Sequence, residues 1–507
     1  MVVPFNPLKL LLLVGWFYLC LYCVQRTQFS ALVPKRHKPV ANLVTLFVGP
    51  LLLMALAVID AVRQSRHGSN TTFAVLAAHL RTALSTIRLA KTNTPRKEKI
   101  RLLDSSGRGI KEIYGRGKTS RHQQHILDLT EQIVFDALED GASDILIDPA
   151  DSNVHTVRFR IDGVLRNVRR LDADTAQAVI NSIKAAANMD ISERRRPQDG
   201  AFTARTSDTT AAFRVASAGV VHGEKLSIRV LNQNISTFTL DSIGLSGKQR
   251  AVIRNAIKKP SGMILLCGPT GSGKTTTLYA MLNEIDFYTR NVITVEDPIE
   301  CVLPNCSQIE VNPRAGITFA SSLRSILRQD PDVICVGEIR DEETAAIALR
   351  ASQTGHLVLA TIHCDTNAAA IVRLMDLGVS ELLMASGLSV LTSQRLVRRL
   401  CQRCKIKAQP THAEIAEFRR KGINYAGMYQ PKGCRQCNDT GYRGRIGIFD
   451  ILVLDDKLKA LIAKKELSVE ALKTEGEKKG KSNLYKQALK LVVTGVTSQD
   501  ELKRVLG

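Results

Sequence analysis

The sequence predicts an α/β protein whose core is a parallel β-sheet covered by helices on both faces. From Ser261 to about Arg398, four continuous apolar runs alternate with segments of helical apolar spacing, and this order is typical of such a sheet. A glycine-rich loop joins the first run to the first helix. The predicted strands are Met263–Cys267, Val292–Val295, Val333–Val336 and Leu357–Thr361, and the predicted helices are Thr276–Ile285, Phe319–Leu327, Glu343–Gln353 and Ala368–Leu377.

Two apolar runs open the chain. Leu8–Val24 contains one charged residue, Lys9, and Val40–Val62 contains one, Asp60. Because a membrane-spanning helix needs about 20 apolar residues, the second run is long enough to cross a bilayer and the first is marginal. We expect residues 1–62 to anchor the chain in a membrane; a buried hairpin of a soluble domain is the alternative. Basic residues between the runs leave the number and orientation of the spans open.

The positive charge of the chain is concentrated after these runs. The 507 residues carry a formal net charge of +22, and residues 63–122 alone contain 14 Lys and Arg against 3 Asp and Glu. We expect a basic juxtamembrane linker over residues 63–122, which anionic lipid would attract. The remainder is closer to charge balance and has few aromatic residues, so no nucleic-acid partner is expected.

A smaller α+β domain is expected over residues 123–240. Helical spacing predicts helices at Ile126–Leu138 and Ala176–Ala187, and Gly141 can end the first of them. The dipeptide Asp162-Gly163 predicts a tight hairpin turn. The predicted strands are Ile145–Ile147, Thr156–Ile161, Val164–Val168, Phe213–Ser217 and Leu226–Leu231. This domain presents three arginines, Arg205, Arg214 and Arg229.

The glycine-rich loop predicts a nucleotide site. Its residues are Gly268, Pro269, Thr270, Gly271, Ser272, Gly273, Lys274, Thr275 and Thr276. Glycine lets the backbone approach a phosphate, and the loop N–H groups and the following helix N-terminus form an anion cradle. Lys274 can reach the terminal phosphates and Thr275 can offer its hydroxyl to Mg²⁺. We therefore expect ATP and Mg²⁺ as cofactors.

Polar residues follow the other three strands. The loop Glu296–Glu300 follows the second run, Glu338 follows the third and His363 follows the fourth, which His356 precedes. Ligands of such sheets bind beyond the carboxyl ends of the strands, so these side chains should converge on the nucleotide. One carboxylate can hold Mg²⁺ through water and another can orient the attacking water. His363 is expected to sense the γ-phosphate.

Four of the eleven cysteines have metal-ligand spacing. Cys401 and Cys404 form one CxxC pair, Cys434 and Cys437 form another, and 29 residues separate the pairs. Paired CxxC sequences predict tetrahedral Zn²⁺ coordination. Disulfides are the alternative, but an ATP-using domain belongs in reducing cytosol. We expect a zinc element at 401–440 with a helical insertion near Ala413–Arg420, and a C-terminal helical region at 441–507.

Taken together, the motifs resemble those of the secretion ATPases of type II secretion and type IV pilus assembly. The resemblance covers about Gln124–Gly507, some three quarters of the chain. It is carried by GASDILIDP (141–149), FRIDGVL (159–165), RRPQDGAF (195–202), GEKLSIRVL (223–231), the P-loop, ITVEDPIE (293–300), LRSILRQDPDVICVGEIRDEETA (323–345), TGHLVLATIH (354–363), the paired CxxC and GYRGRIGIFDIL (441–452).

The resemblance implies a RecA-like P-loop ATPase core at 241–400, preceded by the α+β domain as a PAS-like domain. It implies a homohexamer at the cytoplasmic face of the inner membrane, which acts on membrane platform proteins to drive pilus or pseudopilus assembly and protein export. Glu296 matches the glutamate that activates water and Glu338 the Walker B glutamate, while His356 and His363 fall in a histidine box. Arg214 and Arg229 match arginines that reach the nucleotide, often across a subunit boundary. The cysteines match the zinc module of assembly members.

The chain departs from this family at three places. Leu146 stands where the family usually has His, and Cys364 where it usually has Thr. The two apolar runs replace the family's soluble adaptor region, so direct anchoring is expected in place of recruitment by a partner. A membrane-tethered motor for DNA transfer or uptake is the alternative function, which the basic charge and the cysteine pairs favour.

Overall fold

The computed structural model describes residues 100–114, 121–206, 210–231, 237–420, 422, 427–464 and 484–507. The chain divides into two compact units, Met1–Glu98 and Lys99–Gly507, and all described residues belong to the second. The apolar runs Leu8–Val24 and Val40–Val62 lie outside the described residues. No helix among the described residues is long and apolar enough to cross a membrane.

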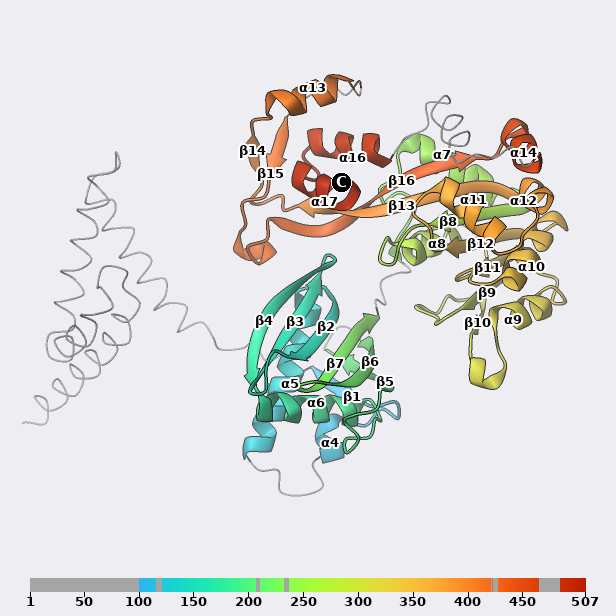
Figure 1. The fold of residues 1–507 in the computed structure, drawn as a ribbon. Coiled ribbons are helices and arrows are strands. Elements are labelled where there is room, and N and C mark those ends of the chain that lie inside the picture. The colour runs from blue at the N-terminus through green and yellow to red at the C-terminus, as the bar shows by residue number, and fades with distance from the viewer. Residues whose placement is uncertain are drawn as a thin grey trace, which may run out of the picture. The chain divides into compact units, whose positions relative to one another are not determined.

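The first part of this unit is built on a seven-stranded antiparallel sheet with the order β1-β5-β6-β7-β2-β3-β4 (Figure 1). Its strands are β1 (Arg101–Leu103), β2 (Ala142–Pro149), β3 (Val154–Ile161), β4 (Val164–Asp172), β5 (Gln198–Arg205), β6 (Thr210–Val220) and β7 (Gly223–Leu231). Helices α4 (Ile110–Tyr114), α5 (Arg121–Glu139) and α6 (Ala173–Ala186) accompany it. One apolar core joins these helices to the sheet. This is the α+β domain that the sequence predicts.

The turns of this domain form where the sequence predicts them. Asp162 and Gly163 join β3 to β4 with φ values of 50° and 84°, the left-handed pair that a two-residue hairpin needs. Gly141 follows α5 with φ 64°, which only glycine adopts easily. The predicted turn and helix stop are therefore confirmed.

The domain also begins earlier than expected. Part of the predicted linker 63–122 forms β1 and α4, and the side chains of Ile100, Leu102 and Ile110 are buried in the domain core. Strand β1 pairs with β5, an unpredicted strand that contains the QDGAF part of the RRPQDGAF motif. Its Gly and Asp lower the strand propensity of the segment, and pairing on both edges outweighs that deficit.

The second part is a seven-stranded sheet with the order β10-β9-β11-β12-β8-β13-β16 (Figure 1). Its strands are β8 (Gly262–Cys267), β9 (Val292–Glu296), β10 (Ser307–Glu310), β11 (Val333–Val336), β12 (Leu357–Ile362), β13 (Leu388–Leu400) and β16 (Tyr442–Val453). The helices associated with it are α7 (Gly247–Ile257), α8 (Lys274–Leu282), α9 (Phe319–Ile326), α10 (Glu342–Gln353), α11 (Asn367–Asp376), α12 (Glu381–Gly387) and α14 (Asp456–Ala463). The four predicted strands are confirmed and pair in parallel at the centre of the sheet.

Both faces of this sheet are buried. Along β8, Met263, Leu265 and Cys267 pack in one apolar core, whereas Ile264 and Leu266 pack in another. Successive side chains of a strand point to opposite faces. The two cores therefore lie on opposite faces, as a helix-covered parallel sheet requires. Cys267 acts as a small apolar residue, as expected.

The expected C-terminal helical region 441–507 begins with a strand instead. Residues 442–453 form β16, which pairs antiparallel with β13 and is an edge strand of the sheet. The alternation of Ile446 and Ile448 with Arg445 and Gly447 carries the period-two signal of a strand, which sequence analysis overlooked. Helices α16 (Leu484–Val493) and α17 (Gln499–Leu506) confirm helical structure in the remaining described tail.

The segment between the two CxxC pairs has secondary structure of its own. Strands β14 (Ile406–Ala408) and β15 (Met428–Gln430) form a two-stranded antiparallel sheet. Helix α13 (His412–Arg420) lies between them in the chain, which confirms the predicted insertion. Two short 3₁₀ helices, η3 (Pro313–Ala315) and η4 (Arg435–Cys437), complete the described elements.

Candidate functional site

A cavity of about 900 Å³ lies at the carboxyl ends of the central parallel strands. Its lining includes the loop Pro269–Thr276, the ends of β9, β11 and β12, residues of β2, β3 and β7, and the end of α17. Of the predicted catalytic residues, those that line it are Lys274, Glu296, Glu338, His363 and Arg229. The first four residues come from separate segments of the parallel sheet and meet at one site, as the position of the strand ends predicts, and Arg229 joins them from the other sheet.

The backbone of the glycine-rich loop is shaped by glycine. Gly271 and Gly273 have φ values of 74° and 89°, and Gly273 caps the N-terminus of α8. A Cβ on Gly268 would collide with the Ser272 hydroxyl and the carbonyl of Gln394. The Gln394 side chain on β13 donates from Nε2 to the Ser272 carbonyl at 2.8 Å. The loop is therefore supported by the neighbouring strand.

Lys274 is buried against the loop that it ends. Its Nζ donates to the carbonyls of Gly268 at 2.7 Å and Pro269 at 3.2 Å, and lies 3.4 Å from His363 Nδ1. Burial lowers the pKa of the Lys274 ammonium, and the charge of Glu338 partly opposes this. Loop carbonyls thus hold the cation at the place where phosphate oxygens can replace them.

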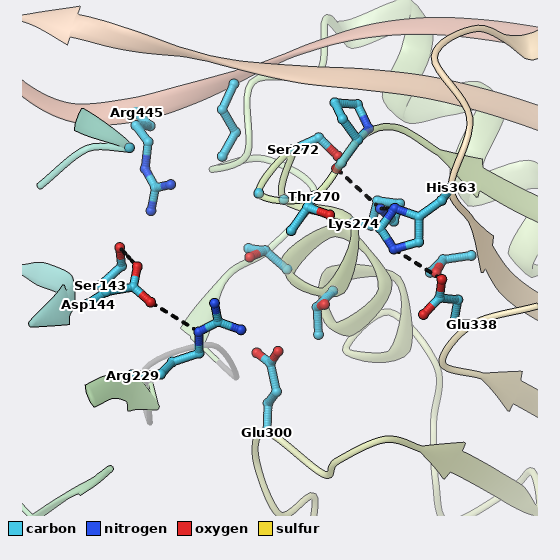
Figure 2. A pocket seen from close by; sticks show the side chains of 18 of the residues that line it. Ser143, Asp144, Arg229, Thr270, Ser272, Lys274, Glu300, Glu338, His363 and Arg445 are labelled. Carbon is cyan, nitrogen blue, oxygen red and sulfur yellow. Dashed lines mark hydrogen bonds and ion pairs between the residues drawn. The ribbon is translucent and has the colours of Figure 1, made fainter. Parts of the chain in front are cut away.

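Glu338 is held at both of its oxygens. His363 Nε2 lies 3.0 Å from Oε1, and Arg340 Nε donates to Oε2 at 2.8 Å. A neutral His363 that donates from Nε2 and accepts from Lys274 at Nδ1 satisfies both contacts. Figure 2 shows Lys274, His363 and Glu338 in this row. The ends of β11 and β12 are thereby linked to the glycine-rich loop.

Glu296, the last residue of β9, and Glu300, in the loop that follows, have different environments. Glu296 is 4 % exposed and accepts three hydrogen bonds, from the hydroxyls of Tyr279 at 2.7 Å and Thr294 at 2.6 Å and from the Gln308 amide at 3.1 Å. The Glu300 carboxylate, in contrast, points into the cavity near Arg229 (Figure 2).

The surroundings of Glu300 also shift its acidity. Burial raises the pKa of the Glu300 carboxyl and the charge of Glu296 raises it further, whereas Arg229 and Arg214 oppose the shift. The sequence predicts that the loop containing Glu300 lies at the nucleotide site, but Glu300 was not among the predicted catalytic residues. Its position at the end of the Glu-Asp-Pro-Ile-Glu segment was the available signal.

The two predicted arginines face each other on neighbouring strands. Arg214 on β6 and Arg229 on β7 are cross-strand partners. Arg229 lines the cavity, and its Nε lies 3.2 Å from Asp144 Oδ1. Arg214 is outside the lining, with its Nη2 3.8 Å from Glu310 Oε1. The structure thus places one of the pair in the cavity.

Several residues line the cavity although the sequence did not indicate them, and His356 lies away from it. Arg160, Arg395, Arg445 and Arg504 line it but lie in segments that carry no recognised nucleotide motif. Leu146, one of the three departures from the expected family pattern, is a buried lining residue. His356 lies at the amino end of β12, where its Nδ1 is 3.0 Å from the Ala351 carbonyl. It is therefore at the end of the strand opposite the cavity.

The four paired cysteines come together in a cluster. All four Sγ atoms lie within 4.8 Å of one another, and three of the pairs are 3.9, 3.8 and 3.7 Å apart. Four thiolates at about 2.3 Å from one Zn²⁺ form a tetrahedron with edges of about 3.8 Å. The residues present therefore fit a tetrahedral metal ion.

The backbone around the cluster favours a thiolate. Burial alone would raise the pKa of the Cys437 thiol, but N–H groups of Cys434 and Gly441 donate to its Sγ at 3.3 and 3.2 Å. Together with the neighbouring thiols they lower the pKa of Cys437 to about 6. Thiolate is the form that binds metal ions.

Comparison with known proteins agrees with this geometry. The family described as "Type II/IV secretion system protein" matches residues 119–504. Type II secretion system protein E of Pseudomonas aeruginosa is 41% identical over 383 residues, which cover 75% of each chain. Type II secretion system ATPase E of Vibrio cholerae is 41% identical over 380 residues, again 75% of each chain. Type IV pilus assembly ATPase PilB of Acinetobacter baylyi is 39% identical over 385 residues, 75% of this chain and 66% of its own.

A solved structure supports the fold. The ATPase DotB of Legionella pneumophila superimposes with a TM-score of 0.54 at 21% identity, over 74% of this chain and 94% of its own. This likeness agrees with a RecA-like α/β fold. From the family match and the relatives we conclude that this chain belongs to the type II/IV secretion system protein family and is an ATP-hydrolysing ATPase of secretion or pilus assembly.

Proposed function

We propose that this chain uses ATP hydrolysis at the described cavity to drive pilus or pseudopilus assembly and protein export. The observation that carries the proposal is the row Lys274–His363–Glu338, in a cavity that Glu300 also lines. A phosphate-binding lysine, a metal-binding carboxylate and a water-orienting carboxylate are the groups that phosphoryl transfer to water requires. A motor for DNA transfer gains no specific support from these contacts.

In this proposal the glycine-rich loop, Glu338 and His363 have separate roles. Residues 268–276 bind the phosphates through backbone N–H groups, and Lys274 exchanges its loop carbonyls for phosphate oxygens. The Thr275 hydroxyl and Glu338 would hold Mg²⁺, which neutralises charge that develops on the phosphates. His363 contacts both Lys274 and Glu338, so it can respond to the terminal phosphate.

We assign the water-orienting role to Glu300 and a supporting role to Glu296. A general base must offer a lone pair to the attacking water. The three donors to Glu296 occupy most of its acceptor capacity, since a carboxylate offers about four lone-pair positions. Glu300 faces the cavity, and its raised pKa makes it a better proton acceptor than an ordinary carboxylate. Glu296 then holds Tyr279 and the base of the loop in place.

The two glutamates give matched variants that test this assignment. Glu300→Gln should lower kcat by roughly 100-fold or more with little change in KM, because it removes only a transition-state interaction. Glu296→Gln should lower kcat less and reduce the melting temperature, because it disturbs a buried network. Steady-state ATPase assays and thermal melts measure both effects, with Lys274→Ala as the variant that loses nucleotide binding. A larger kcat loss in Glu296→Gln than in Glu300→Gln would reverse the assignment.

A homohexameric ring is the assembly that we propose for Arg214 and Arg229. Their side chains are 43% and 68% exposed, although both come from a domain that contributes to the cavity. Exposed guanidinium groups can approach a nucleotide held by an adjoining subunit and stabilise charge on the transferred phosphoryl group. In a closed ring every such contact is repeated at each interface.

Mixed assemblies test the ring. Inactive Glu338→Gln subunits mixed with an equal amount of wild type should reduce turnover far below the about 50% that independent subunits give. Arg214→Ala subunits should still bind ATP, because the cavity itself is intact. They should hydrolyse it poorly, because the proposed contact with the transferred phosphoryl group is lost. ATPase assays on a titration of mixing ratios measure the effect. A linear loss of activity with the fraction of Glu338→Gln subunits would contradict a cooperating ring.

The cysteine cluster is proposed to hold one structural Zn²⁺ through Cys401, Cys404, Cys434 and Cys437. Its Sγ separations support tetrahedral coordination. A closed set of four thiolates leaves no open position for substrate, so the role is structural. Bound metal would cross-link the ends of β13 and β16, which the cluster adjoins in sequence.

Metal analysis tests the zinc element. Protein purified without chelator should contain one Zn²⁺ per chain, and Cys404→Ser should lose it and lower the melting temperature, because zinc binding contributes directly to folding free energy. Cys306→Ser is the control, since this half-buried cysteine lies outside the cluster. Zinc-free native protein with four alkylatable thiols in the cluster would refute the proposal.

We also propose that residues 1–62 anchor the chain at the cytoplasmic face of the inner membrane, followed by a basic linker. The platform proteins of the machine would be its membrane partners there. Our proposed division is a PAS-like domain at 123–240, extended backwards by β1 and α4, a RecA-like domain at 241–400 together with β16, the zinc element at 401–440, and the C-terminal helices. The apolar length of Val40–Val62 and the basic residues 63–99 support the anchor.

Carbonate extraction tests the anchor. Full-length protein should stay with membranes at alkaline pH, whereas a chain starting at Arg63 should be soluble or released by salt, because screening weakens its basic contacts with lipid. The shorter chain should still bind ATP, since it keeps the whole cavity. Membrane fractionation and a nucleotide-binding assay measure both properties. Full-length protein that carbonate extracts would return the apolar runs to a soluble domain.

A further inference from the structure

Arg340 contacts the candidate catalytic carboxylate of Glu338 and the carboxylate of Asp297 without lining the cavity. Its Nε donates to Glu338 Oε2 at 2.8 Å and its Nη1 donates to Asp297 Oδ2 at 3.2 Å. Arg340 is not among the described residues that line the cavity. It therefore differs from Arg229, which faces the nucleotide space directly, and it can influence the nucleotide only through the carboxylates that it holds.

The loop that carries Arg340 is fixed to both neighbouring strands. The Gly337 N–H donates to the Val295 carbonyl of β9, and the Ile339 N–H donates to the Thr361 carbonyl of β12, both at 2.8 Å. Ile339 is 2% exposed and packs in the sheet core. Glu338 and Arg340 flank this buried residue in the chain, and the hydrogen bond between them shows that their side chains lie together.

Arg340 completes a two-sided grip on Glu338. His363 contacts one carboxylate oxygen and Arg340 the other, which leaves about two lone-pair positions for a metal-bound water. Rotation of the carboxylate would break one of these contacts. The rigid fork of a guanidinium suits such a grip better than the single, mobile ammonium of lysine does.

The second contact of Arg340 joins two loops. Asp297 lies next to Glu296 at the start of the loop that ends with Glu300. Without a cation between them, Asp297 and Glu338 would present two negative charges to each other, which is unfavourable. The hydrogen bond to Glu338 in turn raises the pKa of Arg340. The cation therefore balances the charge of both loops.

We propose that Arg340 is a positioning residue for ATP hydrolysis, which bridges Glu338 and Asp297 and holds the metal-binding carboxylate and the Glu300 loop in their working arrangement. The inference rests on the proposed role of Glu338. Arg340 contributes no contact to the nucleotide, so its loss should affect the chemical step and leave binding intact. The loss should also be partly reversible by a small cation placed in the vacated space.

The test uses the full-length protein with Arg340→Ala, Arg340→Lys and the control Arg314→Ala, an exposed arginine of η3. Arg340→Ala should lower kcat by roughly 10- to 100-fold, as loss of groups that orient metal ligands does, with KM and fluorescent-ATP affinity within about 2-fold. Arg340→Lys should retain an intermediate kcat. Guanidinium at about 20 mM, far below unfolding concentrations, should restore several-fold activity to Arg340→Ala alone.

The outcomes separate this inference from the proposed function. Glu338→Gln is assayed in parallel, without and with guanidinium, and should be slow and unrescued. A wild-type rate for Glu338→Gln would overturn the carboxylate assignment itself. A slow Glu338→Gln beside a normal Arg340→Ala would overturn only the positioning role, as would an equal rise in KM or a kcat loss that Arg314→Ala shares. A slow but folded Arg340→Ala that guanidinium does not rescue would show a merely structural role. If Arg340→Ala lacks a wild-type melting transition, Arg340→Gln replaces it in the same assays.

Discussion

The buried ammonium of Lys274 is the constraint on which the rest of the site depends. A cation taken out of water needs several acceptors around it, and here two loop carbonyls and His363 supply them. That arrangement requires a sharp turn between β8 and α8, which the left-handed Gly271 and Gly273 make possible. It also requires β12 beside β8, so that His363 emerges next to the loop. The positions of the candidate catalytic groups therefore depend on the strand order of the sheet.

A second constraint is the meeting of opposite charges from two domains. Glu300 follows a strand of the parallel sheet, whereas Arg229 belongs to the antiparallel sheet. Arg229 also contacts Asp144 Oδ1. The other oxygen of this carboxylate, Oδ2, lies 3.2 Å from Arg160 Nε. Because Asp144 and Glu300 both interact with arginines, their negative charges are partly offset without a nucleotide. Phosphates that enter would compete with Asp144 and Glu300 for the same arginines.

The sequence predicts the parallel sheet well because each of its signals is local. The strands around Leu265 and Ile334 are unbroken apolar runs, and the turn at Asp162-Gly163 is encoded in two adjacent residues. Strand β5 was not predicted because its Asp199 and Gly200 weaken the apolar pattern, while its pairing partners lie elsewhere in the chain. Propensity gives way to tertiary pairing in such segments.

The site itself divides in the same way. The proposed phosphate-binding role of Lys274 follows from a contiguous motif, and the cysteine cluster follows from spacing. The difference between Glu296 and Glu300 does not, because both are strand-end glutamates in the sequence. Hydrogen bonds from Tyr279 and Gln308, which lie on other elements, separate them in the folded chain. Arg445 and Arg504 are similar cases, since the folding of distant segments alone brings them to the cavity.

The cysteine cluster and the cavity are linked by the same two strands. Gln394 on β13 supports the glycine-rich loop, and farther along this strand Arg398 donates to Glu501 of α17 at 2.8 Å. Beyond β13 the Cys401 N–H donates to the Gly441 carbonyl at 2.8 Å, just before β16 begins. A metal cross-link at this end would fix the register of two long strands, because their pairing continues from there to Val453. Arg445 pairs with Arg398 near this same end of the two strands, and it lines the cavity. A metal ion bound by the cysteine cluster would therefore also help to order the part of the cavity wall that Arg445 forms.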